Sequence, residues 1–214
     1  AGNTVNYNGA TQTVSGIVYS NLTLSNAGAK PLNAATTVIG NLNNAINATL
    51  ATGNFGVTLG GNFTNSGTFN AGSSPIIING AASQSIAGFS TTGSISINKS
   101  GLTTFTSSVS TTGNLSLSSG AVVDLGSILT HTAGTLTLNG NSQNGGKWGG
   151  SLATTATNKS ATYFGTTAAG IVTVASPSCT SGYWTGITST DWNAGSNWCG
   201  GTVPTSTVDV VVPA

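Results

Sequence analysis

The side chains that could carry acid–base or metal chemistry are few and far apart in this 214-residue chain. Its carboxylates are Asp124, Asp191 and Asp209, its single histidine is His131, and it contains no Glu, Arg or Met. Enzymes that use general acids, general bases or metal ions bring several such groups to one point. Because these groups are spread over separate parts of the chain, the sequence predicts no enzyme, no metal site and no cofactor.

His131 and Asp124 have simpler interpretations than catalysis. His131 lies between Thr130 and Thr132, which predicts an outward-facing position on a strand. Asp124 follows two valines and is expected to pair with a lysine or to cap a coil. A glycosidase would need two carboxylates a few ångströms apart. We therefore expect both residues to be structural.

Both cysteines and three of the four tryptophans lie within Cys179–Cys199. Two cysteines that bracket a small aromatic module most simply form a disulfide. Closing a loop of about 20 residues would stabilise the fold by roughly 3 kcal/mol in the chain-entropy model, and the bond implies an oxidising compartment. A zinc site would need four ligands, and His131 is distant in the sequence. The sequence predicts a Cys179–Cys199 disulfide.

The same stretch holds the candidate ligand-binding residues Trp184, Asp191, Trp192 and Trp198. They could form a loop that contacts a sugar or calcium, with the tryptophans as a stacking platform. Alternatively, Asp191 caps a turn and the tryptophans are the core of a small module. Calcium needs six or more oxygen ligands, and Asp191 has no neighbouring carboxylate in the sequence. The structural interpretation is favoured.

The elements that position these residues follow from the composition, which is 37% hydrophobic and only 3% charged. Val, Ile and Thr recur in short alternating runs, which are typical of strands. The four lysines are scattered, so we expect neither a nucleic-acid partner nor an anionic membrane partner. No run approaches the roughly 18 apolar residues of a membrane helix. The chain is predicted to be ordered and nearly all-β.

An internal repeat is the strongest positive signal. Asn8–Gly16 recurs as Asn79–Gly88, and a weaker third copy begins at Asn139. After the first two copies the match continues at a spacing of 73 residues, which places Leu22–Leu24 on Ile95–Ile97. A period this long is too long for one solenoid coil and fits about three coils of roughly 20–25 residues. Ala34–Leu50, the one stretch with a partly helical pattern, is interpreted as another coil.

These observations predict an all-β fold, a parallel β-helix over residues 1–175 with a small disulfide-linked β module at 176–214. Stacked coils would complete the backbone ladder and bury a continuous core. A tandem β-sandwich is the alternative. The expected strands are short and bounded by Gly, Asn or Ser: Ile17–Leu24, Val57–Phe63, Pro75–Asn79, Ser94–Asn98, Asn114–Leu117, Ala121–Leu125, Thr135–Leu138 and Gly170–Val174.

Several stretches resemble repetitive surface proteins of Bacteroidota that are secreted by the type IX system, including the large adhesins of gliding bacteria. They are Trp184–Gly186, Ser189–Trp192, Asn197–Trp198, Val203–Pro204, Asp209–Val210, Gly61–Phe69, Thr135–Gly140 and Ala156–Phe164. The resemblance implies a secreted β-helical adhesin or filament on the cell surface. Because Ala1 opens directly into strand-like sequence, we expect a piece of a longer polypeptide.

Three functions remain open at this point. The first is a stiff structural rod that associates with further copies or with other cell-surface components. The second is a carbohydrate-binding module at the tryptophans, with surface polysaccharide as its partner. The third is ice binding by rows of Thr-x-Thr. The repeat counts against it, because Thr11-Gln12-Thr13 in the first copy is replaced by Ser83-Gln84-Ser85 in the second, and a grid that changes residue type is a poor template for ice.

Overall fold

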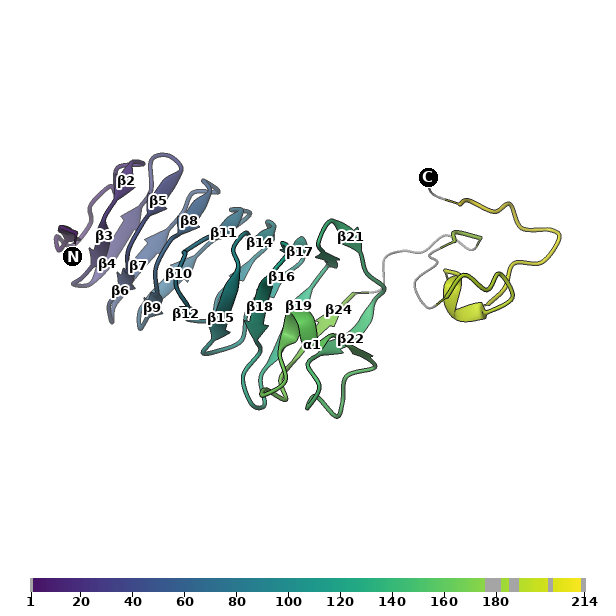
Figure 1. Ribbon diagram of the computed structural model, residues 1–214. Coiled ribbons are helices and arrows are strands. Elements are labelled where there is room, and N and C mark those ends of the chain that lie inside the picture. The colour runs from purple at the N-terminus through teal and green to yellow at the C-terminus, as the bar shows by residue number, and fades with distance from the viewer. Residues whose placement is uncertain (1, 176–181, 185–188, 200–201, 213–214) are drawn as a thin grey trace.

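The computed structural model describes residues 2–175, 182–184, 189–199 and 202–212. Short strands form almost all of the regular structure there, and the exceptions are the helix α1 (Ala161–Phe164) and the 3-10 turn η1 (Gly195–Asn197). No helix in these ranges is long and apolar enough to cross a membrane. Successive strands lie side by side along one axis, so the chain winds into a β-solenoid (Figure 1).

The strands of the solenoid line three faces. The first sheet contains β1 (Thr4–Tyr7), β3 (Asn21–Leu24), β6 (Leu42–Asn44), β9 (Phe63–Asn65), β12 (Gln84–Ile86), β15 (Gly101–Phe105) and β18 (Ala121–Asp124). The second sheet contains β2 (Val18–Tyr19), β5 (Thr36–Val38), β8 (Val57–Leu59), β11 (Ile76–Ile78), β14 (Ile95–Ile97), β17 (Asn114–Leu117), β20 (Thr135–Leu138) and β21 (Asn141–Ser142).

The remaining face is divided between two shorter sheets. The third sheet contains β4 (Gly28–Pro31), β7 (Ala48–Ala51) and β10 (Thr68–Asn70). The fourth sheet contains β13 (Ser90–Thr91), β16 (Ser110–Thr111), β19 (Thr130–Ala133), β24 (Ile171–Val174), β22 (Gly146–Gly149) and β23 (Asn158–Lys159).

Neighbouring strands pair in parallel, mostly with one coil of chain between the partners. Leu22 pairs with Leu42, and Leu42 pairs with Phe63 one coil later. The step from β19 to β24 is longer, because β20 to β23 and α1 lie between these two strands in the sequence. The predicted parallel β-solenoid is confirmed, and the tandem sandwich is wrong because nearly all pairings are parallel.

The commonest strand has three residues that point in, out and in, as in Val57-Thr58-Leu59. Such a strand needs only two aliphatic side chains, which explains a low hydrophobic fraction in an ordered chain. The corners require unusual backbone, and Asn26 and Asn47 supply it at φ values of 60° and 67°. Asn tolerates the left-handed region better than most residues. The Asn-rich composition therefore reflects the corners as well as the surface.

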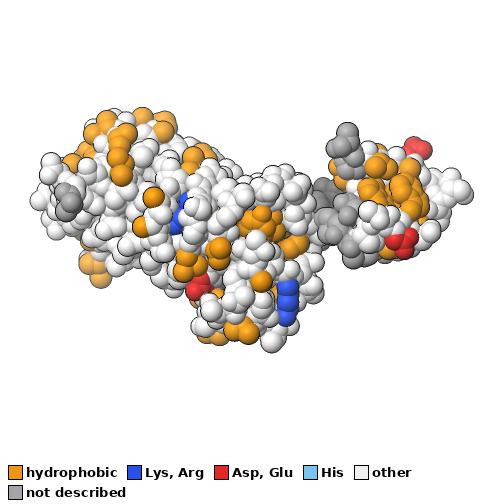
Figure 2. Space-filling model, in the orientation of Figure 1, with side chains coloured by type: hydrophobic (Ala, Val, Ile, Leu, Met, Phe, Trp, Pro, Cys, Tyr) orange, Lys and Arg blue, Asp and Glu red, His pale blue; other side chains and the backbone are white. Residues whose placement is uncertain are grey.

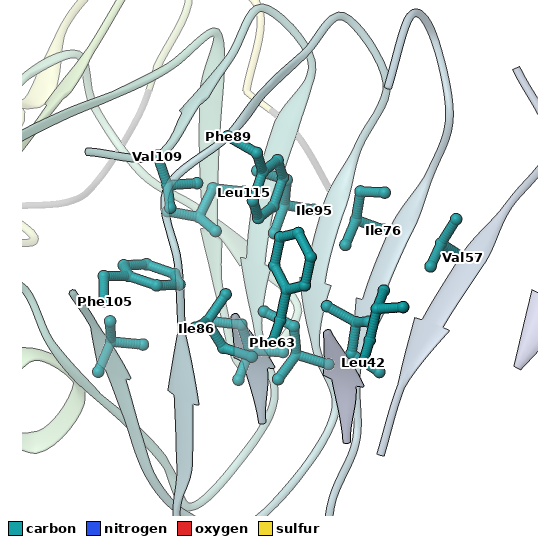
Figure 3. Close-up of a cluster of buried hydrophobic side chains, with 14 of the residues drawn as sticks. Leu42, Val57, Phe63, Ile76, Ile86, Phe89, Ile95, Phe105, Val109 and Leu115 are labelled. Carbon is teal, nitrogen blue, oxygen red and sulfur yellow. The ribbon is translucent and has the colours of Figure 1, made fainter. Parts of the chain in front are cut away.

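The core is a stack of inward side chains that repeat from coil to coil. Figure 3 shows side chains of the first and second sheets facing one another, among them Leu42 and Phe63 opposite Val57 and Ile76. All four are at most 2% exposed.

Three aromatic rings pack together in this core. The rings of Phe63, Phe69 and Phe89 pack edge to face, with centroids 5.2–6.4 Å apart. Burial of inward side chains drives the stacking, because a single coil could not cover them.

The 73-residue echo in the sequence joins different faces of the solenoid. Leu22–Leu24 forms part of β3 in the first sheet, whereas its echo Ile95–Ile97 is β14 in the second sheet. Likewise, Gly28 opens β4 in the third sheet, and its echo Gly101 opens β15 in the first sheet. The echo is therefore not a whole number of coils. The repeated unit is instead a strand with its turn, and the same unit occurs on different faces of the solenoid.

The C-terminal end of the solenoid is closed by structure that breaks the parallel pattern. β21 pairs antiparallel with β20, and β22 pairs antiparallel with β24. α1 packs against β18, the last strand of the first sheet. Each of the three sheets that reach this end is thus covered by a hairpin, a reversed strand or a short helix.

The stretch predicted as Ala34–Leu50 is a coil, as expected, because β5, β6 and most of β7 lie within it. The expected boundary near residue 176 falls next to residues 176–181, which lie outside the described part of the chain. The division into 1–175 and 176–214 therefore stays a prediction.

Candidate functional site

The tryptophans predicted as a candidate site do come together. Trp184 and Trp192 stack, with ring centroids 5.1 Å apart and an interplanar angle of 19°. The Trp198 ring stands on edge against both, at 4.9 Å from Trp184 and 4.4 Å from Trp192. Three aromatic rings that pack in this way bury a large apolar area in a short segment. We call these three residues the tryptophan cluster.

Hydrogen bonds around Asn197 hold the loop that carries two of the rings. The Asn197 amide donates to the Asp191 carbonyl oxygen at 2.8 Å and to Ser189 Oγ at 3.0 Å. The Ser189 backbone N–H donates in return to Asn197 Oδ1 at 2.9 Å. Trp198 Nε1–H donates to the Trp192 carbonyl oxygen at 2.7 Å. Asn197 is fully buried, so these bonds are shielded from water.

Backbone pairing ties this loop to the segment near Val211. The Trp184 backbone N–H donates to the Val211 carbonyl oxygen at 2.8 Å, and the Val211 N–H donates to the Gly182 carbonyl oxygen at 2.9 Å. The Cys199 N–H donates to the Tyr183 carbonyl oxygen at 3.0 Å. Residues 182–184, 189–199 and 202–212 therefore form a small folded unit with the tryptophan cluster as its core.

The members of the predicted site differ in what they present to solvent. Trp198 is 3% exposed, whereas Trp192 is 45% exposed and the adjacent Tyr183 is 40% exposed. Asp191 caps a turn, as the structural interpretation predicts, because its Oδ1 accepts the Asn193 backbone N–H at 2.9 Å. Trp192 is therefore the most exposed ring of the cluster. A ligand-binding role for this site stays a prediction.

The predicted disulfide cannot be placed, because Cys179 lies outside the described residues. Cys199 is buried, and it directly follows Trp198, which forms an antiparallel β-bridge with Trp184. The Cys179–Cys199 bond stays a prediction.

His131 points into the solenoid, so the prediction of an outward position is wrong. It is 2% exposed and packs 5.2 Å from the Phe105 ring. Its Nδ1 accepts the Val109 backbone N–H at 3.0 Å, which places the proton on Nε2, and that N–H donates to the Leu125 carbonyl oxygen at 3.1 Å. Burial lowers the pKa of the ring. Thr130 and Thr132 point outward and His131 points inward, because the core can hold an imidazole whose two nitrogens are both hydrogen-bonded.

Lys30 is a buried residue that the sequence did not single out. It is fully buried, and its Nζ donates to the carbonyl oxygen of Gly9 at 2.8 Å. The carbonyl oxygens of Ala10, Asn26 and Gly28 lie 3.4–3.5 Å from the same nitrogen. Oxygen atoms of the backbone thus surround the ammonium group and replace its hydration.

Lys99 repeats this arrangement farther along the solenoid. Its Nζ donates to the carbonyl oxygens of Ala82 at 2.5 Å and Leu102 at 3.1 Å, and burial lowers its pKa. Ala10 and Ala82 belong to the first and second copies of the repeated Asn-Gly motif. A lysine from the next coil therefore anchors the loop in both copies. The signal in the sequence was the presence of a lysine one coil after each of these motifs.

The outward surface of the second sheet is a single column of small and β-branched residues. Figure 2 shows how few charged side chains interrupt the surface on one side of the molecule. The column follows the strand register: Val18, Thr37, Thr58, Ile77, Ser96, Ser116 and Thr137.

The N-terminal end of the solenoid leaves core positions open to solvent. Val5 pairs with the buried Leu22 and continues its inward column, yet Val5 is 43% exposed. Ile17 of the same coil is 55% exposed. The hydroxyl groups of Tyr7 and Tyr19, 2.8 Å apart, close only part of this end. We call this surface the open end.

Comparison of the sequence with protein-family models and curated proteins, and of the structure with solved structures, finds no match. Within the described ranges no group of three or more His, Cys, Asp or Glu side chains could hold a metal ion.

Proposed function

We propose that this chain is a structural segment of an extracellular cell-surface adhesin or filament, in which it serves as a stiff rod. The observation that carries the proposal is the parallel register, which continues from β1 to β18 in the first sheet and from β2 to β20 in the second. Each coil adds about 4.8 Å of length and a full set of backbone hydrogen bonds. Bending such a rod would require bonds on one face to lengthen.

The charge distribution supports association between rods. Lys30 and Lys99 are buried, so only Lys147 and Lys159 place an ammonium group on an exposed residue of the solenoid. Copies of such a surface repel one another weakly. The coils around the open end add little repulsion either, because no charged side chain occurs before Lys30. We propose further copies and other surface components as partners.

The extracellular location is part of the proposal. Its supports are the resemblance to type IX-secreted proteins of gliding bacteria and the predicted Cys179–Cys199 disulfide, which requires an oxidising compartment. No cysteine among the described residues is a free thiol. Mass spectrometry of the intact chain before and after reduction would test the bond.

Electron microscopy combined with sedimentation tests the rod. We expect particles of uniform width whose association is lost in the variant Val5→Asp, which places a charge at the open end. Ile128→Asp is the matched control, because Ile128 is 89% exposed elsewhere on the solenoid. Antibodies against the chain should also label intact cells that express the parent protein. Flexible particles, or labelling only after lysis, would contradict the proposal.

Carbohydrate binding by the tryptophan cluster is the second candidate, and the exposure of Trp192 favours it. Aromatic rings stack on the apolar faces of sugars, and the Trp184–Trp192 stack holds the exposed ring rigid. Surface polysaccharide would then be a partner. Titration with polysaccharides should quench the fluorescence of the chain and not that of Trp192→Ala. Equal responses of both proteins would exclude this site.

Ice binding is the least supported of the three functions. A flat sheet with a regular threonine grid would be required, whereas the outward column of the second sheet changes from Val18 to Thr58, Ile77 and Ser96. An assay of thermal hysteresis without any effect would remove it.

A further inference from the structure

The repeated motif contains a chemically reactive pair, Asn followed by Gly, and the copies differ in how that pair is held. The chain has four such pairs: Asn8-Gly9, Asn79-Gly80, Asn139-Gly140 and Asn144-Gly145. In an Asn-Gly pair the backbone nitrogen of Gly can attack the side-chain carbonyl of Asn, since Gly offers no side chain to hinder the approach.

We propose that Asn139 is a site of spontaneous deamidation and that the folded structure protects the first two copies. The nitrogen of Gly140 would form a bond to Cγ of Asn139 and lose its proton to water, while the side-chain nitrogen leaves as ammonia. Water then opens the resulting succinimide at either carbonyl. The products are aspartate and isoaspartate at position 139.

Glutamine side chains protect the glycine nitrogen in the first two copies. The Gly9 N–H donates to Gln12 Oε1 at 2.5 Å, and the Gly80 N–H donates to Gln84 Oε1 at 2.9 Å. A nitrogen whose proton is held by an amide oxygen must break that bond before it can attack its own neighbour. Gly80 is also buried, so its nitrogen has less access to water that could take up its proton.

Lysine side chains also bind the same two loops. Lys30 Nζ donates to the Gly9 carbonyl oxygen, and Lys99 Nζ donates to the carbonyl oxygen of Ala82. Attack on the Asn side chain requires the backbone around the Asn-Gly bond to rotate. These contacts oppose that rotation in the first two copies.

The third copy lacks both kinds of restraint. Asn139 and Gly140 are exposed and form the two-residue turn between β20 and β21, with φ values of 48° and 81°. Gln143, at the position of the protecting glutamines, donates instead to the Asn141 carbonyl oxygen at 2.9 Å. Within the described chain the Gly140 N–H has no acceptor, and a Cβ placed on Gly140 would meet nothing within 4 Å.

The fourth pair resembles the third, because the backbone of its Asn is held whereas its glycine nitrogen is not. The Asn144 carbonyl oxygen accepts Trp148 Nε1–H at 2.8 Å. Likewise, the Asn139 N–H donates to the Leu117 carbonyl oxygen at 2.8 Å, and the Asn139 carbonyl oxygen accepts from the Asn141 side-chain amide at 3.4 Å. Among the described residues no side chain accepts the N–H of Gly140 or Gly145, so we expect the fourth pair to react faster than the first two.

The product carries a charge that the chain otherwise nearly lacks. One conversion at Asn139 would cancel the formal net charge of +1. Net charge near zero favours association of proteins. Ageing of the chain would thus change its surface at the closed end of the solenoid.

Peptide mapping by mass spectrometry after timed incubation of the folded chain in mildly alkaline buffer tests this proposal. We expect Asn139 to convert about tenfold faster than Asn8 or Asn79, the factor that one hydrogen bond of ordinary net strength supplies. In denaturant all four pairs should convert at similar rates, because each is Asn followed by Gly. That comparison separates the fold from the intrinsic chemistry.

Two glutamine variants sharpen the test. Gln12→Ala frees the Gly9 N–H and should accelerate conversion of Asn8 without changing that of Asn139. Gln143→Ala is the matched control, because Gln143 does not bind its glycine, and it should change neither rate. Equal rates at all sites in the folded chain, or an unchanged Asn8 rate in Gln12→Ala, would overturn the proposal. Near-UV circular dichroism of each variant checks that the fold is kept.

Discussion

An inward side chain in the middle of the solenoid has an equivalent neighbour one coil before it and another one coil after it. Within the described part of the chain, each ring of the tryptophan cluster packs against the two other rings instead. Leu42, for example, lies between Leu22 and Phe63 in a column that runs the length of the first sheet. In the C-terminal unit, three rings and the buried Asn197 stand in for such a column. The solenoid is stabilised by many equivalent contacts along each column, whereas the C-terminal unit is stabilised by a few contacts among the same residues.

The sharpest test of this difference is Trp198→Ala. Trp198 contacts both other rings and donates to the Trp192 carbonyl oxygen, so its loss removes most of the core of the unit. Trp→Ala in a core typically costs about 3–5 kcal/mol, which should unfold the C-terminal unit and leave the solenoid intact. Protease cleavage confined to this unit, with unchanged far-UV circular dichroism, is the expected result.

Trp192→Ala is the control for that variant, since its ring is 45% exposed. It should make the unit less stable but not abolish its protection from protease. Equal sensitivity of both variants would mean that the buried ring is not the organising contact.

In the solenoid, Phe63→Ala should cost a similar amount, about 3–5 kcal/mol, without local collapse. Phe63 is 1% exposed and contacts Phe69 and Phe89, but flanking coils keep the column continuous. Denaturant unfolding should show one transition at lower denaturant. Ile128→Ala, at an exposed position, should change stability by no more than about 0.5 kcal/mol. Selective proteolysis near Phe63 would contradict the redundancy.

Acid should destabilise the solenoid through His131, which is the single histidine of the chain. Burial lowers the pKa of His131 in the folded state, so the unfolded chain binds the proton more readily. Stability should be complete above about pH 6.5 and fall as the pH drops from there toward the folded pKa, by at most about 1.4 kcal/mol per pH unit.

Denaturant unfolding at several pH values, compared with His131→Asn, measures this effect. The asparagine can still accept the Val109 N–H, but it does not titrate. Its profile should be flat over the same window. A matching slope in both proteins would assign the pH dependence to another group.

The smallest effect is expected on the outward column of the second sheet. Ser96→Thr adds a β-branched side chain between Ile77 and Ser116, which suits a pleated surface. We expect a gain of up to about 0.5 kcal/mol in the free energy of unfolding. A loss of stability would show that the column is covered in solution by a partner that needs the smaller residue.

Much of the solenoid could be predicted from the sequence because alternation within each strand, as in Ile95-Ser96-Ile97, records which side chain points inward. The predicted coil length of roughly 20–25 residues is also confirmed, because Leu22, Leu42, Phe63 and Ile86 pair in register one coil apart. The assignment of three whole coils to the echo is wrong, because the echo joins strands on different faces. His131 was misplaced for a different reason. Alternation gives the phase of a strand only when one of its two faces is clearly apolar, and Thr-His-Thr is polar throughout.

For the candidate site, the clustering of Trp184, Trp192 and Trp198 followed from their density in a short segment with few other apolar residues. The roles of Lys30 and Lys99 did not. A buried ammonium group is recognisable only when the carbonyl oxygens around it are known, and the closest of these come from loops of the preceding coil.

The interchangeability of the three faces has a consequence for how such a gene can lengthen. A duplication or deletion that adds or removes one strand with its turn moves every later strand to the next face. Each in-out-in strand still buries its aliphatic pair there, as β3 and its echo β14 do in different sheets. Recombination therefore need not respect the length of a coil, and unequal exchange at almost any turn would leave a foldable product.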